Sequence, residues 1–299
     1  MALKDPRSES GSHTAHRPGP GLALRPTRSA VASSRSAFKA LILRDVTVLR
    51  KHSVEFILRT LIQPFLLVFV FLYVFPKIGQ SVGGGTHASA FADVLVPGVI
   101  GISMMFQGVQ SVALTLSQEF GYTREIEDRV QAPCPVWLVA VNKVVSGAVQ
   151  GLIAALIVFP IAAVVHAPGV HPTFDVSWPV ALTLLPLACV TFGALGLVLG
   201  CMFEPRNIGL MFGFIVLPIT FLGGTYYQWT KLSPVKVGSL PWLQVLVLVN
   251  PLIYVNEGLR AAFTTVSHMP LYVVYPVLCA FCALFLTLGI RAFRGRVLS

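Results

Sequence analysis

The chain has 299 residues, of which 55% are hydrophobic and only 11% are charged, and it carries 22 Lys and Arg against 12 Asp and Glu. About a quarter of the residues of a soluble domain are charged, so a chain this apolar would expose more hydrophobic surface than water tolerates. The composition therefore excludes a soluble globular protein and predicts an all-α integral membrane protein.

The N-terminal segment differs from the rest of the chain. Residues 1–35 are rich in Ser, Arg, Pro and Gly and lack apolar periodicity, which predicts a disordered basic cytoplasmic tail. A nucleic-acid-binding arm is the alternative. A basic tail beside membrane spans normally fixes their topology, so we expect no nucleic-acid partner. Further on, residues 36–53 are predicted to form an amphipathic helix in the membrane interface. Its apolar positions, at helical spacing, are Phe38, Leu41, Ile42, Val46 and Leu49.

Charged residues divide the remaining chain into apolar windows. A spanning helix needs about 20 residues. The uncharged windows are 60–76, 94–118, 144–174, 176–203, 207–230, 237–256 and 261–290. Window 237–256 is interrupted by Pro241 and by the Asn250-Pro251 step, which favours re-entrant extracellular helices before the last span. The sequence thus predicts six transmembrane helices within residues 54–295.

The distribution of basic residues tests this topology. With six spans both termini are cytoplasmic, and 18 of the 22 Lys and Arg lie on the inner side. Seven spans would place Arg291, Arg294 and Arg296 outside, against the positive-inside rule. We therefore expect a multi-pass protein of the cell (plasma) membrane, in contact with lipid and with both termini in the cytoplasm.

The cytoplasmic loop that starts at Glu119 is dense in charge. Glu125, Asp128 and Arg129 are three to four residues apart, so they would share one face of a short helix that ends at Pro133. A merely solvated loop is the alternative interpretation.

Two blocks of sequence carry a family resemblance. The first is the loop from Glu119 with its Asp128-Arg129 step and Ala132-Pro133, followed by residues 136–143. The second comprises residues 217–227, 240–244 and 250–261, which include Leu-Gly-Gly-Thr-Tyr-Tyr and Asn-Pro-Leu-Ile-Tyr. In this order the blocks resemble ABC transporter type 2 exporter permeases, most closely the daunorubicin-resistance branch. The resemblance covers roughly residues 38–295.

The resemblance implies a half-transporter. Two copies of such a permease, or of related ones, would form the pathway as a homodimer or heterodimer, and two copies of a separate ABC ATPase subunit would bind on the cytoplasmic side. The residues implied in ATPase coupling are Glu119, Gly121, Arg124, Glu125, Asp128 and Arg129. The chain has no G-x-x-x-x-G-K-[ST] motif, so we expect it to bind no cofactor and no metal itself, with ATP and Mg held by the partner.

A second implied feature is an extracellular gate. Asn is a good N-cap and Pro suits the first helical position, so a short helix is predicted from Asn250-Pro251 to about residue 262, with Glu257 and Arg260 one turn apart. Related permeases have short helices that dip back from the outer face and close the exit. A surface helix with a weak ion pair is the alternative. The predicted gate residues are Tyr226, Tyr227, Trp229, Trp242, Asn250, Pro251, Tyr254, Glu257 and Arg260.

A substrate path is predicted from polar and soft residues within the second and fifth windows. As core or lipid-facing residues these side chains would look much the same, so the sequence leaves both interpretations open. The predicted path residues are Met104, Met105, Phe106, Gln107, Gln110, Phe212, Phe214 and Phe221.

The sequence therefore favours the permease subunit of an ATP-driven exporter of a hydrophobic or amphipathic compound, such as a drug or secondary metabolite, with multidrug resistance as the associated property. Export of a polysaccharide or glycolipid is the alternative within the family. An intramembrane enzyme is the alternative from a different class, and it would need buried ionisable groups that the predicted spans lack. The motif H-E-x-x-H is also absent, and no catalytic residue is predicted. A channel would need rings of charge within the spans, and the uncharged windows contain none.

Overall fold

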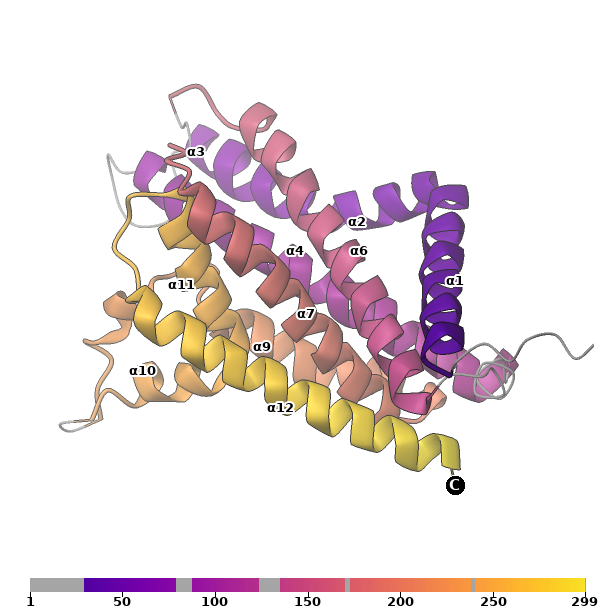
Figure 1. Cartoon of the computed structure of the whole chain (residues 1–299). Coiled ribbons are helices and arrows are strands. Elements are labelled where there is room, and N and C mark those ends of the chain that lie inside the picture. The colour runs from indigo at the N-terminus through magenta and orange to yellow at the C-terminus, as the bar shows by residue number, and fades with distance from the viewer. Residues whose placement is uncertain (1–29, 79–87, 124–134, 170–172, 238–239, 299) are drawn as a thin grey trace, which may run out of the picture.

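The computed structural model describes residues 30–78, 88–123, 135–169, 173–237 and 240–298. Within these residues every secondary-structure element of three or more residues is a helix, and the helices form one bundle (Figure 1). The prediction of an all-α membrane protein is confirmed.

The first helix, α1, spans Ala30–Lys51, so it begins earlier than the predicted 36–53 segment. Residues 30–35 belong to the predicted tail, but they contain neither Pro nor Gly, and nothing local stops the helix there. The rest of the predicted tail, residues 1–29, lies outside the described residues. After His52 the chain turns sharply into α2, and α1 packs beside α6 (Figure 1).

Six helical segments of the described chain are long and apolar enough to cross a bilayer. Their bounds are Ser53–Lys77 (α2 Ser53–Val68, η1 Phe69–Val74 and α3 Phe75–Lys77), Ala90–Gly121 (within α4 Ala88–Gln118 and η2 Glu119–Thr123), Val136–Val164 (α6), Trp178–Met202 (α7), Pro205–Leu222 (η3 Pro205–Asn207, α8 Ile208–Met211, η4 Phe212–Val216 and α9 Leu217–Leu222) and Leu271–Val297 (within α12 Leu271–Leu298). The number agrees with the predicted six spans.

The predicted break at Asn250-Pro251 is also present. A short helical segment, Trp242–Val249 (α10 Trp242–Leu246 and η6 Val247–Val249), meets α11 (Pro251–Phe263) at an angle of 95°. A separate turn, η5 (Trp229–Leu232), precedes this pair. The chain therefore turns within window 237–256 instead of crossing as one straight helix.

The centre of the bundle is formed by α4, α6 and α7 (Figure 1). In the second span 72% of the apolar window is buried, against 22% in the first and 17% in the fifth and sixth. Glycines allow the central helices to approach closely: Gly147 and Gly151 of α6, and Gly196 and Gly200 of α7, all face α4. The two Gly-x-x-x-Gly pairs therefore serve packing within one chain.

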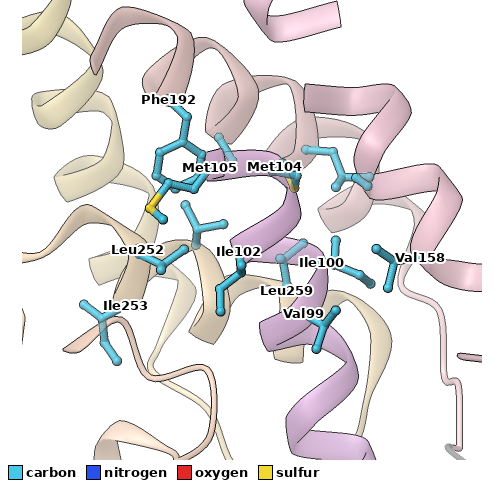
Figure 2. Close-up of a cluster of buried hydrophobic side chains, with 14 of the residues drawn as sticks. Val99, Ile100, Ile102, Met104, Met105, Val158, Phe192, Leu252, Ile253 and Leu259 are labelled. Atoms are coloured by element: carbon cyan, nitrogen blue, oxygen red, sulfur yellow. The ribbon is translucent and has the colours of Figure 1, made fainter. Parts of the chain in front are cut away.

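Helix α11 lies inside this bundle. All of its residues except Ala261 are buried, and it contacts α4, α7 and α12. Figure 2 shows Leu252 and Leu259 of α11 in one apolar cluster with Met105 of α4 and Phe192 of α7. A surface helix is thereby excluded for this segment.

Candidate functional site

The start of α11 is fixed by the residue that the sequence singles out. The Asn250 side-chain oxygen accepts a hydrogen bond from the backbone N–H of Leu252 at 2.9 Å, which is N-cap geometry, and Pro251 takes the first helical position. The Asn250 amide nitrogen also donates to the carbonyl oxygen of Ile219 at 2.7 Å. One side chain thus caps α11 and ties it to α9 in the fifth span.

The predicted pair Glu257 and Arg260 is completely buried. The Arg260 guanidinium donates to Glu257 Oε1 at 2.8 Å, and the solvent-exposed fraction of both side chains is 0%. The carboxylate accepts two further hydrogen bonds, from the backbone N–H of Trp229 at 2.9 Å and of Met269 at 2.8 Å. Glu257 therefore joins α11 to η5 and to the segment that leads into the last span.

Arg260 extends the same network to two further elements. Its guanidinium donates to the carbonyl oxygen of Gly224, just after α9, and to that of Val94 in α4 at 3.4 Å. One turn earlier, the Asn256 amide donates to the carbonyl oxygen of Gly223 at 2.7 Å and to the hydroxyl of Thr225 at 3.2 Å. We call Asn256, Glu257 and Arg260, with the groups that they contact, the outer network.

Two atoms of the outer network lack a partner. Arg260 Nε and Asn256 Oδ1 are buried and form no hydrogen bond to any described residue. A buried polar group without a hydrogen bond costs about 1–3 kcal/mol. The outer network therefore retains unused hydrogen-bonding capacity at these two atoms.

The aromatic residues of the predicted gate surround this network. The Trp229 indole N–H donates to the carbonyl oxygen of Gln244 at 3.2 Å, and the Tyr254 hydroxyl donates to that of Leu248 at 2.9 Å. Trp242 is 46% exposed. Burial raises the pKa of the Tyr226 and Tyr227 hydroxyls above the ordinary value, so both remain neutral at physiological pH.

A second buried ion pair lies where α4 ends and α6 begins. Lys143 Nζ lies 2.5 Å from Glu119 Oε1, and each side chain is 5% exposed. Glu119 begins the short π-helix that leads into the charged loop. The buried carboxylate thus anchors the base of the loop to α6 instead of facing outward.

The neighbouring residue on α6 holds the N-terminal helix. The Asn142 amide donates to Asp45 Oδ2 of α1 at 3.1 Å. Consecutive α6 residues, Asn142 and Lys143, therefore bind the N-terminal helix and the base of the charged loop.

The remaining predicted coupling residues are only partly described. Gly121 is exposed, and a Cβ atom at this position would contact the Pro205 ring at the start of the fifth span. Arg124, Glu125, Asp128 and Arg129 lie outside the described residues. The proposed docking face of the loop thus stays a prediction.

The eight predicted path residues do not converge within one chain. Met104 and Met105 are 0% exposed in the core, whereas Phe214 is 79% and Phe221 57% exposed on the fifth span. Phe106 and Phe212 pack against the core cluster and Gln110 is half-buried. A 330 Å³ cavity between α1, α2, α4 and α6 is lined by other residues.

Gln107 has a contact that explains its polarity. Its side-chain oxygen accepts from the Thr60 hydroxyl of α2 at 3.3 Å, and its amide donates to the Gln150 oxygen of α6 at 3.3 Å. The side chain therefore links the first three spans.

Sequence reasoning missed the contacts of Asp45, Asn142, Lys143 and Asn256. For Lys143 a usable signal exists, because Glu119 and Lys143 border the second and third apolar windows on the same side of the membrane. For Asn256 the signal is weaker. It is an uncharged polar residue six positions after the N-cap, and it directly precedes the ion pair in a helix that is otherwise mostly apolar.

Comparison with known proteins decides the family. The model of the ABC-2 type transporter family matches residues 36–264. The chain belongs to the ABC-2 type transporter family. It is also 31% identical over 231 residues, 76% of this chain and 84% of the relative, to the inner membrane transport permease YadH of Escherichia coli strain K12. The YadH permeases of Escherichia coli O157:H7 and Shigella flexneri match with the same identity and coverage.

Family membership gives the architecture its meaning. The chain is a multi-pass transmembrane permease, a non-enzymatic transport subunit of an ABC transporter. Membership also implies in general that an ABC ATPase is its partner. The outer network and the α6 anchors are therefore features of a transport subunit.

Proposed function

We propose that this ABC-2 permease moves a hydrophobic or amphipathic compound, such as a drug or secondary metabolite, outward across the inner (plasma) membrane. The observation that carries the proposal is the outer network, which holds the bent α10–α11 segment across four other elements through the buried Glu257–Arg260 pair. A segment held by one compact polar cluster can be released as a unit, which is what a gate requires.

The inner side supports the division of labour. With both termini cytoplasmic, the loop that begins at Glu119 and the helix α1 would receive force from two copies of a separate ATPase, which binds ATP and Mg. Lys143 and Asn142 of α6 hold these two segments at adjacent positions, so both would move with the third span. The interfacial position of α1 belongs to the same proposal.

A second permease copy would complete the pathway. The first and fifth spans leave most of their apolar windows unburied, and Phe214 and Phe221 of the fifth span are exposed. Packing of these faces in a homodimer, with lipid on the rest, would place the exposed phenylalanines of the predicted path beside a second subunit.

The proposal is tested with the permease and its partner ABC ATPase, reconstituted together in proteoliposomes. We expect vanadate-sensitive ATP hydrolysis and ATP-dependent movement of daunorubicin, and neither when the ATPase carries a Gln in place of its catalytic Glu. Turnover by the permease alone would contradict a transport subunit. ATP hydrolysis stimulated by a lipid-linked glycan but not by daunorubicin would replace the drug by a polysaccharide or glycolipid substrate.

A further inference from the structure

The structure contains a cavity that the proposed function does not use. It has a volume of about 330 Å³ and lies between α1, the beginning of α2, and the facing sides of α4 and α6. This volume falls within the range of small-ligand sites in proteins. Its polar lining from the spans consists of Glu55, Arg59, Ser111, Thr115, Lys143, Ser146 and Gln150.

Arg59 is the unusual member of this lining. It lies six residues inside the first span, roughly 9 Å along the helix from Ser53. No hydrogen bond or ion pair joins it to another described residue, and its side chain is exposed. Near the end of a span an arginine side chain reaches the level of the lipid headgroups, so a guanidinium that lines a cavity there is placed to meet a phosphate.

Nearby groups add hydrogen-bond donors. Gln150 uses its side-chain oxygen to accept from Gln107, which leaves its own amide N–H groups available. The Ser146 hydroxyl, one turn earlier on α6, has no partner among the described residues. Lys143 also lines the cavity but is bound to Glu119. Donors from a guanidinium, an amide and a hydroxyl suit an anion with several acceptor oxygens.

The two carboxylates of the lining come from the α1–α2 corner, and each has a contact of its own. Asp45 accepts from Asn142, and Glu55 lies 3.7 Å from His52. Arg44, on the same side, adds a further positive charge. With Lys143 bound to Glu119, the lining thus carries Arg44 and Arg59 against these two carboxylates, and Arg59 is the cation that the first span contributes.

The remaining surroundings are apolar and point to a ligand from the bilayer. Val48, Leu49 and Phe56 line the cavity beside the charged groups. On α2, Leu58 and Ile62, which flank Arg59, are 59% and 60% exposed on the surface of the first span. A charged compartment with an apolar lining, at a lipid-facing helix, fits an amphiphile with an anionic head.

We infer that this cavity binds the phosphate headgroup of an anionic lipid, with Arg59 as its main charge contact and Ser146 and Gln150 as donors. Arg59 suits a phosphate because a guanidinium donates two parallel hydrogen bonds to it. The inference does not rest on the proposed direction of transport or on the ATPase.

The test uses the full chain, purified in a neutral detergent and freed of lipid. Its thermal unfolding is followed at increasing concentrations of dioctanoyl phosphatidate, with dioctanoyl phosphatidylcholine and inorganic phosphate as separate arms. We expect phosphatidate to raise the unfolding temperature well below the concentration at which phosphatidylcholine does. Protection by inorganic phosphate but not by phosphatidate would overturn the lipid as the source of the anion.

The variants locate the effect. Arg59→Gln should raise the half-maximal phosphatidate concentration on the order of tenfold or more, because it removes a charge-assisted hydrogen bond. Arg291→Gln removes the same charge from an exposed position of α12 outside the cavity and should change that concentration less than about twofold. If Arg59→Gln does not fold, Ser146→Ala, which loses one neutral hydrogen bond, should still weaken protection by about two- to tenfold. Wild-type protection of both variants, or equal protection by the two lipids, would overturn the site.

Discussion

Replacement of Glu257 by Gln is the sharpest perturbation of the outer network. Glutamine keeps the size of the side chain but removes the negative charge, so the Arg260 cation stays in a position with 0% exposure and no opposite charge. Removal of one partner of a buried pair costs about 3–5 kcal/mol. The amide also replaces an acceptor oxygen by a donor, which opposes the N–H of either Trp229 or Met269. The total loss should thus reach at least about 3–5 kcal/mol.

The chain offers a matched control for this variant. Glu204 and Arg206 form an ion pair at 2.7 Å, but their side chains are 56% and 80% exposed. Glu204→Gln should cost no more than about 1 kcal/mol, because water solvates the charge that is left. Both variants are compared with the wild type by denaturant-induced unfolding in detergent.

A double variant separates the charge from the shape. Arg260→Met in the Glu257→Gln background removes the stranded cation, so the double variant should be more stable than Glu257→Gln alone. If Glu257→Gln is as mild as Glu204→Gln, the two charges are solvated or separated in the folded chain, and the argument from burial fails.

Further predictions concern the inner anchors, the glycines and the topology. Lys143→Met should lower the unfolding free energy by about 3–5 kcal/mol, because Glu119, which is only 5% exposed, loses its 2.5 Å partner. Lys231 is exposed, so Lys231→Met should have little effect. Equal unfolding midpoints of the two variants would refute the buried pair. Gly98→Ala should reduce the folded yield, because its Cβ would overlap the backbone of Thr225, while Gly209→Ala, with open space around it, should be tolerated; detergent-extracted monodisperse protein measures both. In a cysteine-free background, a cysteine at Ser233 should be labelled from outside and one at Arg294 from inside, and outside labelling of Arg294→Cys would require a seventh span.

The features predicted correctly from the sequence depend on local chemistry. Six spans follow from the positions of charged residues, because a charge can rarely remain in the hydrocarbon. The start of α11 follows from Asn250 and Pro251, because an N-cap needs only a side-chain acceptor two residues before a backbone N–H. Each of these signals lies within the segment whose structure it determines.

The features that the sequence does not reveal depend on distant partners. Glu257 is recognisable as a charge near Arg260, but its bonds to Trp229 and Met269 use backbone N–H groups, which every non-proline residue has. The burial of the predicted path residues is hidden from the sequence for a different reason. Met105 in the core and Phe214 on the outer surface are both apolar, and in a membrane the core and the lipid favour the same side chains.

The two buried pairs also restrict how a permease of this fold could move. Glu119 and Lys143 join α4 to α6 where α4 ends and α6 begins, and the glycine contacts of α6 with α4 continue that contact along the helices. The second and third spans should therefore move as one body. At the outer end, Arg260 bridges Val94 of α4 and Gly224 after α9, so a displacement of the fifth span from the second must break one of these bonds. Because Asn250 and Asn256 also tie α11 to Ile219 and Gly223 of the fifth-span side, the 3.4 Å contact of Arg260 with Val94 is the one that would break first, while Glu257 keeps the cation paired within α11.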